Sequence, residues 1–374
     1  MNFNNKKTVL FVINVDWFLI SHFLPVAVKM LNKDCEVHIL CKFTTKKDYL
    51  KSLGFIVHDI DISRGRANIA RELATLKQMY KTIKEIAPDV MELYTIKPVI
   101  YGGIISRLLN IKKNIFYITG LGYVFISRGF VSSMKTVIYK SLYRFAIQGK
   151  NTRVIVENIS DGNFINALNV VNSSRIHLIK GAGVDLGKIN YVEEINDQVV
   201  VVMASRFLRD KGIFEYVKAA KIIKDKGLNV KFELYGDIDK DNPASLDNSE
   251  VSIIKDEKIV KVCGFSKDIV SIFLKANIVV LPSYREGFPK VLIEAAACGR
   301  AVVTTDVPGC RDAIQTNVTG LLCSSRDELS LAIQIERLIL DSKLRSSMGR
   351  NGRRMAIEEF DQDKIIKKHV EIFE

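Results

Sequence analysis

The sequence predicts an α/β protein made of two Rossmann-like domains, each built on a parallel sheet. Short, continuously apolar runs alternate with longer segments of helical periodicity. This alternation occurs twice, once in the first half of the chain and again from about Val199. The length of 374 residues suits two domains better than one core. We place the division at 1–185 and 186–360.

The first series contains five expected strands with helices between them: VLFVI, VHIL, FIVHDI, VMELY and NIFYITG. The first strand is expected at Thr8–Asn14, followed by a loop and a helix over about 22–31. A longer helix is expected over 68–86, where Ile69, Leu73, Leu76, Tyr80, Ile83 and Ile86 recur at helical spacing.

The second series contains five more expected strands: QVVVVMAS, VKFELYG, IVKVCG, NIVVLP and AVVTTD. Their apolar runs are typical of a parallel sheet that helices cover on both faces. The polar stretch from Asp185 to Asp197 is expected to link the domains.

Charge is distributed unevenly along the chain. Residues 1–190 carry a net charge of +14, and residues 191–374 carry −1. From Leu93 to Val156 there are ten Lys or Arg residues and no acidic one. This asymmetry favours an anionic partner, namely a membrane surface, a phosphorylated substrate or nucleic acid, over lysines that merely solvate the surface.

The segment 131–150 combines an apolar stripe with basic residues. The stripe comprises Val131, Met134, Val137, Ile138, Leu142, Phe145 and Ala146. A helix here could pack into the core or lie in a membrane interface. We expect the stripe to pack on the domain and Lys135, Lys140 and Arg144 to face lipid headgroups.

The six cysteines form no Cys-x-x-Cys pair and no metal-ligand spacing, which favours reduced thiols in a cytoplasmic protein. The apolar N-terminal region is interrupted by Asp16, Ser21, His22 and Pro25. It is therefore not expected to be a signal or membrane-spanning segment.

The segment REGFPKVLIEAAACG, residues 285–299, places two glutamates around a turn and a helix start. Gly287 permits close approach of a ligand to the backbone, and Pro289 suits a first helical turn. The helix start offers free amides to a diphosphate. Glu286 would accept hydrogen bonds from sugar hydroxyls, and Glu294 from a ribose. The alternative is that both glutamates merely favour a helix N-terminus.

A second candidate, ASRFLRDKG, follows another strand end. Arg206 and Lys211 stand five residues apart before a helix. A guanidinium and an ammonium together suit a leaving diphosphate, although a solvated loop would also contain such residues.

Taken together, these segments resemble the retaining glycosyltransferases of the GT-B fold, in family 4. The resemblance is strong over most of 199–325 and looser in the first half. It rests on SRFLRDKG, LYGD, VCGF, LPSYREGFPKVLIEAAACGRAVVTTDVPGCRD and NVTGLL. It implies two Rossmann-like domains facing a cleft, with a last helix at about 361–374 that crosses back onto the first domain.

The resemblance implies a role for each matching residue on the donor side. Arg206 and Lys211 would hold the donor diphosphate, and Glu286 the transferred sugar. Glu294 would bind the ribose. The remaining donor-side positions are Gly236, Gly287, Phe288 and Pro289. No metal or other cofactor is expected, so the triplets Asp59/Asp61 and Asp237/Asp239 would be coincidental.

The first domain would bind the acceptor. YTIKP, with Lys97, and YITGLGYVF, with Thr119 and Gly120, resemble the family's acceptor-side loops. Many relatives have a histidine where this chain has Thr119, and a hydroxyl cannot do acid–base work near neutral pH. The Thr-Gly-Leu-Gly-Tyr form resembles a subgroup that extends undecaprenyl-diphosphate-linked sugars. His22 and Asp16 are further candidates, with roles confined to local structure as the alternative.

We therefore expect a peripheral enzyme on the inner face of the bacterial plasma membrane. It would transfer a hexose or N-acetylhexosamine from a UDP-sugar to a polyprenyl-diphosphate-linked saccharide during surface glycan assembly. The alternatives are another GT-B nucleotide-sugar enzyme, such as a 2-epimerase, or a non-catalytic membrane-associated basic protein. Nucleic acid is not expected as a partner, because no recognition motif for it is present.

Overall fold

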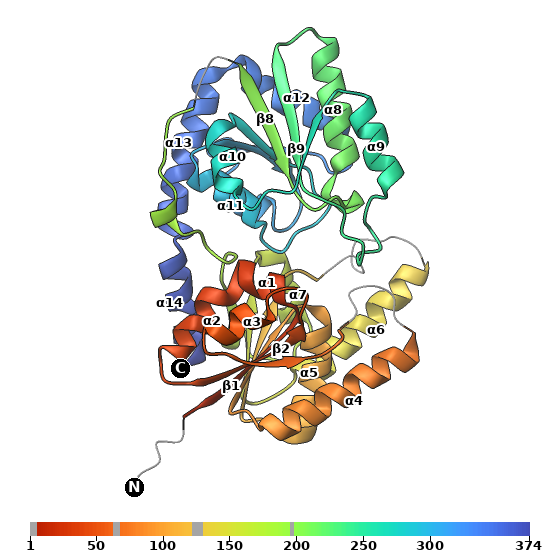
Figure 1. Cartoon of the computed structure of the whole chain (residues 1–374), viewed down its shortest axis with the longest axis vertical. Helices are drawn as coiled ribbons and strands as arrows, with labels where there is room; N and C mark the ends of the chain where they lie inside the picture. Colours follow the sequence, from red (N-terminus) through yellow and green to blue (C-terminus); the bar gives the residue numbers. More distant parts are fainter. Residues whose placement is uncertain (1–5, 63–67, 122–129, 195–197) are drawn as a thin grey trace. The chain divides into compact units, whose positions relative to one another are not determined.

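The computed structural model describes residues 6–62, 68–121, 130–194 and 198–374. The chain forms two compact units (Figure 1). The first comprises Met1–Ile179 together with Ile365–Glu374, and the second comprises Lys180–Lys364. The units thus divide at 179–180, a few residues before the position expected from the sequence.

The first unit is built on seven parallel strands in the order β3-β2-β1-β4-β5-β6-β7. Their bounds are β1 Thr8–Val15, β2 Glu36–Lys42, β3 Ile56–Asp59, β4 Val90–Tyr94, β5 Lys113–Ile118, β6 Thr152–Val156 and β7 Ile176–Leu178. The helices are α1 Asp16–Phe18, α2 Leu24–Leu31, α3 Lys47–Ser52, α4 Ile69–Ile86, α5 Ile96–Leu109, α6 Phe130–Ile147 and α7 Ile159–Ala167. Residues of α2 pack on one face of the sheet, and residues of α4, α5, α6 and α7 on the other.

The second unit contains six parallel strands in the order β10-β9-β8-β11-β12-β13. Their bounds are β8 Val199–Ala204, β9 Val230–Tyr235, β10 Lys261–Gly264, β11 Ile278–Leu281, β12 Ala301–Thr305 and β13 Gly320–Cys323. The helices are α8 Ile213–Asp225, α9 Asn248–Asp256, α10 Ile269–Lys275, α11 Lys290–Ala297, α12 Glu328–Leu340, α13 Ser342–Glu359 and α14 Gln362–Phe373. Helix α14 starts in this unit, but from Ile365 onward its residues belong to the core of the first.

Each sheet has one position where the strand order reverses. In the first unit it lies between β1 and β4, and in the second between β8 and β11. Loops diverge there at the carboxyl ends of the strands, and this is where open α/β sheets bind ligands.

All ten expected strands are present, but three further strands were not predicted. These are β6, β7 and β13, two of which have only three or four residues. The expected loop after the first strand is also absent. Helix α1 starts at Asp16, directly after β1, and continues through a π-helical turn at Leu19–Phe23 into α2.

The expected apolar faces of two helices are only partly right. On α4, Ile83 is buried and Leu76 and Ile86 pack against the core as expected, but Ile69, Leu73 and Tyr80 are exposed. Thr75 and Met79, which were not predicted, are buried. On α6, the described part of the predicted stripe is largely exposed, including Val137, Ile138, Leu142 and Phe145. That helix packs through Tyr143, Ala146 and Ile147. The helical spacing of the apolar residues predicted both helices correctly. Which face of each helix is buried depends on the neighbouring helices.

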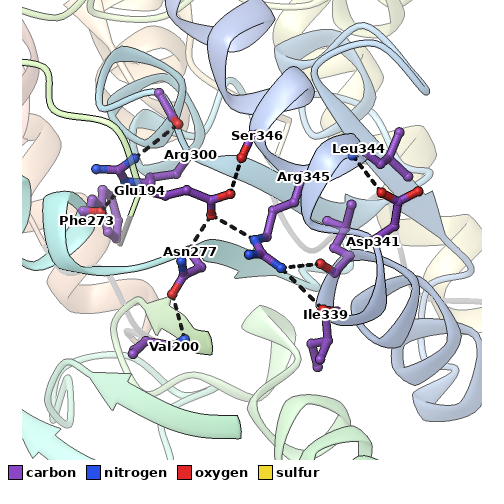
Figure 2. A network of polar contacts seen from close by, with 12 residues as sticks. Glu194, Val200, Phe273, Asn277, Arg300, Ile339, Asp341, Leu344, Arg345 and Ser346 are labelled. Carbon is purple, nitrogen blue, oxygen red and sulfur yellow. Dashed lines mark hydrogen bonds and ion pairs between the residues drawn. The ribbon is translucent and has the colours of Figure 1, made fainter. Parts of the chain in front are cut away.

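The polar stretch expected to link the domains is partly built into the second unit. Glu194 accepts hydrogen bonds from Arg345 at 2.8 Å and from Asn277 at 3.0 Å, and it also pairs with Ser346 (Figure 2). The Glu194 and Arg345 side chains are only 8% and 3% exposed. Arg300, which is almost fully buried, donates to the carbonyl of Val192 at 2.9 Å. These contacts attach residues 192–194 to the second unit.

A buried carboxyl group lies in the core of the first unit. Glu92, on β4, accepts hydrogen bonds from Tyr94 at 2.5 Å and Tyr117 at 3.2 Å. The Tyr117 hydroxyl lies 3.3 Å from His369 Nδ1 on α14. Burial raises the pKa of Glu92 to about 7, although the two tyrosine hydrogen bonds oppose the shift. The neutral carboxyl is therefore the form that the folded core favours below this pH.

This shift predicts that stability falls as pH rises from about 4.5 to about 7. Over that interval the folded state holds a proton on Glu92 that the unfolded chain releases, so deprotonation opposes folding. The expected loss is on the order of 3 kcal/mol. Glu92→Gln keeps the shape without the charge and should remove this part of the pH dependence. Denaturation of both proteins across pH 4.5–8 measures it, and parallel profiles for the two would contradict the assignment.

Candidate active site

Two segments singled out in the sequence meet at the switch point of the second unit. One contains the basic Lys211 and the other the acidic Glu286. Residues 205–211 follow β8, and residues 282–289 follow the adjacent β11. The backbone N–H of Tyr284 donates to the carbonyl of Asp210 at 2.8 Å, which joins the two loops directly. Gly212 allows this approach. A Cβ there would lie 2.2 Å from the Pro282 carbonyl oxygen.

Lys211 and Glu286 form the centre of this arrangement. The Lys211 ammonium lies 2.5 Å from Glu286 Oε1, and the Ser283 hydroxyl donates to the same oxygen at 2.6 Å. The Lys211 and Glu286 side chains are 19% and 12% exposed. They are therefore partly desolvated, which strengthens their interaction with each other and with a charged ligand.

Arg206 lies on the same strand-end loop and is more exposed. Its guanidinium pairs with Asp239 at 2.5 Å. Asp239 thus acts as a partner for Arg206 within the structure. The other Asp-x-Asp triplet behaves similarly, since Asp61 pairs with Arg71. No group of three or more metal-ligating side chains occurs in the part of the chain that the structure describes.

The second glutamate lies on α11, which starts directly after Pro289. The Glu294 side chain is 14% exposed, and its carboxylate lies 3.5 Å from the Lys290 ammonium. Burial raises the pKa of Glu294, while Lys290 opposes the shift. A largely buried carboxylate near the start of a helix can accept hydrogen bonds from neutral hydroxyl groups.

The backbone around Gly287 is held by the loop after β12. The N–H of Glu286 donates to the Pro308 carbonyl at 3.3 Å. Gly309, at φ +81°, lies so close that a Cβ would come within 2.6 Å of the Glu286 carbonyl oxygen. The Pro-Gly-Cys-Arg segment therefore positions the Glu286–Gly287 backbone by close packing.

Two predicted donor-side residues have clear structural environments. The Phe288 side chain is buried, packs edge-on against Phe360 and lies over Gly181, so only its backbone remains for a ligand. Gly236, at φ +144°, lies against the end of β8. A Cβ there would overlap the Ser205 carbonyl oxygen, so only glycine fits.

The sequence did not identify three polar side chains in the segment from the end of β8 to the start of α8. Ser205 Oγ, Asp210 Oδ1 and Glu215 Oε2 are buried atoms without a hydrogen-bond partner among the described residues. Burial raises the pKa of Asp210, against the effect of Lys211. Buried polar atoms normally have partners, so these atoms favour a ligand or water at this position. The available signal was position in the chain, since Ser205 directly follows β8 and Glu215 lies in the first turn of α8.

In the first unit, Asp16 is fully buried and anchors a loop. Its carboxylate accepts hydrogen bonds from the Thr44 N–H at 2.8 Å and hydroxyl at 2.7 Å, and from the N–H groups of Thr45 and Lys46. Burial alone would raise the pKa of Asp16, but these hydrogen bonds lower it. The carboxylate is thus occupied by the backbone of residues 44–46.

His22 and Lys97 also have partners. His22 lies in the π-helical turn, where its Nδ1 is 2.6 Å from the Ser21 hydroxyl and its ring is 4.3 Å from that of Phe18. The Lys97 ammonium, in the first turn of α5, lies 2.5 Å from Glu72 of α4.

The loops after β1, β4 and β5 contain two features that the sequence did not reveal. Thr95 caps α5 at φ +71°, which is unusual for a β-branched residue, and its hydroxyl is buried without a partner among the described residues. Asn14 Oδ1, near the end of β1, is likewise unpartnered. Thr119 and Gly120 follow β5, beside β4 in the sheet, and both are half-buried.

Both halves of the chain match families of glycosyltransferases. Residues 8–158 match the family described as "Glycosyl transferase 4-like" and residues 188–355 the family "Glycosyl transferases group 1". A Campylobacter jejuni relative, N,N'-diacetylbacillosaminyl-diphospho-undecaprenol alpha-1,3-N-acetylgalactosaminyltransferase, is 28% identical over 95% of each chain. The capsular polysaccharide biosynthesis glycosyltransferase CapM of Staphylococcus aureus is 28% identical over 89% of this chain and 88% of its own.

Solved structures agree on the fold. Anabaena HepE, determined in complex with UDP-glucose, has a TM-score of 0.74 over 98% of this chain and 99% of its own, at 18% identity. The fold and the two matching domains define the class, a glycosyltransferase of the GT-B fold. Within that class, the chain combines a domain that matches the 4-like glycosyltransferases with one that matches the group 1 glycosyltransferases.

Proposed function

We propose that the protein transfers a sugar, with retention of anomeric configuration, from a UDP-sugar to a polyprenyl-diphosphate-linked saccharide. The observation that carries the donor side is the partly desolvated Lys211–Glu286 pair at the switch point, with Arg206 on the same loop. The UDP-glucose bound to HepE and the lipid-linked substrate named for the Campylobacter jejuni relative support the two substrate classes.

In this proposal, the bound donor replaces contacts that side chains of the second unit make with each other in the structure. Lys211 and Arg206 stabilise the leaving diphosphate, and the α11 start supplies backbone amides. Glu286 accepts hydrogen bonds from the transferred sugar, and Glu294 from the ribose. These positive side chains supply charge stabilisation without a metal, so a chelator should leave turnover unchanged.

The acceptor side of the proposal uses the strand ends of the first unit. Thr95 and Asn14 offer polar atoms there that have no partner within the described part of the chain, and Thr119 offers a hydroxyl. Because Thr119 cannot act as a base near neutral pH, the proton of the attacking hydroxyl passes to the leaving phosphate on the same face of the sugar. Front-face attack of this kind retains configuration.

The test uses the purified chain, a synthetic polyprenyl-diphosphate N-acetylhexosamine and a panel of UDP- and GDP-sugars. Mass spectrometry should show one added hexose or N-acetylhexosamine, and the linkage should have the same anomeric configuration as the donor. Transfer from no donor by folded protein would overturn the proposal. Epimerisation of a UDP-sugar without acceptor would instead favour the epimerase alternative.

The proposal also places the protein on an anionic membrane surface, through α6. Its exposed face combines the apolar Val137, Ile138 and Phe145 with Lys140 and Arg144. Both kinds of side chain favour an interfacial position, the apolar ones by burial and the basic ones by attraction to anionic lipids. The Lys135 side chain lies outside the described residues. No described helix is long and apolar enough to cross a bilayer.

Replacing three exposed apolar residues of α6, as Val137→Ser/Ile138→Ser/Leu142→Ser, should weaken binding to anionic vesicles by ~10-fold or more. A separate variant, Lys140→Glu/Arg144→Glu, should weaken vesicle binding at low salt by a larger factor than the apolar variant does. A matched control is Ile253→Ser/Leu329→Ser, two exposed apolar residues of the second unit. Vesicle co-sedimentation measures all of them. Unchanged binding by both α6 variants would exclude this surface.

A further inference from the structure

A second group of basic residues lies at the amino ends of the strands of the first sheet, whereas the acceptor-side loops lie at the carboxyl ends. A pocket of about 270 Å³ opens at the amino ends of β5, β6 and β7. Its described lining contains no acidic residue and consists of Lys112, Lys113, Lys150, Asn151, Thr152, Arg153 and Arg175. Neither the donor nor the acceptor proposal uses this pocket, although four of its five basic residues belong to the acid-free stretch.

Most of these positive charges are not neutralised within the structure. Arg153 and Lys113 donate to the carbonyls of Ile372 and Phe373, at the end of α14, and Arg175 donates to the carbonyl of Lys150. Carbonyl groups satisfy hydrogen bonds but carry no net charge. Among the lining residues, ion pairing to a described carboxylate is recorded for Lys112, with Asp89 at 2.9 Å.

A neighbouring pocket shows what a neutralised arrangement looks like. It is lined in part by Lys6, Lys7 and Lys33, at the amino ends of β1 and β2. There, Lys6 pairs with Asp34 at 2.6 Å and Lys33 pairs with Glu374. The contrast shows that the first pocket is distinctive in concentrating basic groups without matching carboxylates.

Like charges within about a Debye length of each other repel, so this arrangement is unfavourable without an anion. This repulsion contributes to a lowered pKa of Lys113. Burial, then the charges of Arg153 and Lys7, lower its pKa to about 8, and the more weakly acting Glu92 and Glu374 oppose the shift. A bound anion would relieve the repulsion and hold Lys113 in its charged form.

We propose that this pocket binds a compact anion carrying two or more phosphate groups. Guanidinium forks and ammonium groups together match phosphate oxygens on several sides. The volume lies near the lower limit for small-molecule sites, ~300–1,000 Å³, which suits a diphosphate better than a nucleotide. Such a group could come from a soluble diphosphate or from a phospholipid headgroup, since Lys150 follows α6 closely in the chain.

The first arm of the test measures binding of inorganic pyrophosphate by calorimetry at low salt. Lys150→Gln/Arg175→Gln should weaken this binding by ~10-fold or more, because each lost charge removes a charge-assisted contact. The control Lys77→Gln/Lys84→Gln removes the same charge from exposed positions on α4 and should have little effect. Lys211→Ala should leave this binding event in place, which separates it from the donor site.

Proton linkage gives an independent readout in the same experiment. Binding to wild type near pH 8 should take up protons as Lys113 becomes charged, so the heat should vary with the ionisation enthalpy of the buffer. The second arm adds vesicles containing lipids with clustered phosphates. If Lys150→Gln/Arg175→Gln also loses vesicle binding, the ligand is a headgroup. If only pyrophosphate binding is lost, the ligand is soluble. Equal pyrophosphate binding by wild type and this variant, or none by wild type, would overturn the proposal.

Discussion

Lys211→Ala is expected to lower kcat by ~10²–10³-fold, the effect of removing one group that stabilises developing charge in a transition state. The Lys211 ammonium lies in a partly desolvated position, 2.5 Å from Glu286, at the meeting point of the loops after β8 and β11. Water in that position would have to reorganise before it could stabilise the leaving group as the ammonium does. Glu286→Gln should cause a loss of similar size, because it replaces one accepting carboxylate oxygen with an N–H donor and removes the negative charge.

The control for these variants is Lys218→Ala, on the exposed side of α8, where the ammonium pairs with Glu328 at 3.3 Å. It removes the same charge from the same unit and should retain wild-type kcat. Steady-state kinetics with the donor and acceptor that the transfer assay identifies provide the measurement, with thermal unfolding to verify the fold. If Lys211→Ala retains more than about a tenth of wild-type kcat, Lys211 does not stabilise the leaving group.

The second large effect concerns stability. Glu194→Ala should destabilise the second unit by about 3–5 kcal/mol, because the Arg345 guanidinium stays buried without its carboxylate partner. Arg345 would keep its hydrogen bond to the Leu338 carbonyl, at 2.8 Å, which cannot neutralise the charge. Figure 2 shows how Asn277 and Ser346 converge on the same carboxylate, so their groups lose partners too.

Hydrogen exchange followed by mass spectrometry measures this locally. Strongly protected amides of the second unit should exchange ~10²–10⁴-fold faster in Glu194→Ala, while those of the first unit should change little. The matched control is Glu336→Ala, which breaks the more exposed Lys226–Glu336 pair and should change stability by less than about 1 kcal/mol. Equal effects of the two variants would mean that burial of the Glu194–Arg345 pair has no energetic consequence.

The position of the residues proposed for the donor side could largely be predicted, because they lie next to strong local signals. Lys211 and Glu286 each follow a continuously apolar strand, and parallel strands in α/β domains end at the same edge. The sequence could not show that these two side chains would pair, since 75 residues separate them. The unpartnered atoms of Ser205, Asp210 and Glu215 could not be predicted at all, because burial without a partner depends on every neighbouring element.

The errors have a common physical cause. A helix such as α6 has apolar residues on more than one side, and the packed side is chosen by α5 and the sheet, which the local spacing does not describe. Glu194 lies in a polar segment whose composition resembles that of a linker. It is nevertheless buried, because Arg345, on a helix far away in the sequence, supplies a compensating charge. Short strands such as β7 and β13 form by pairing with a neighbour and carry little signal of their own.

The sequence by itself determined the two α/β series, the charge asymmetry and the residues that follow β8 and β11. These are local properties, since each depends on the apolar periodicity or composition of a short segment. Only the tertiary structure decided which groups pair, which helix faces stay exposed and where basic residues gather without carboxylates. Those outcomes depend on contacts between segments distant in the chain. Lys112, Lys150 and Arg175 show this most clearly, because strand order alone brings them to one pocket.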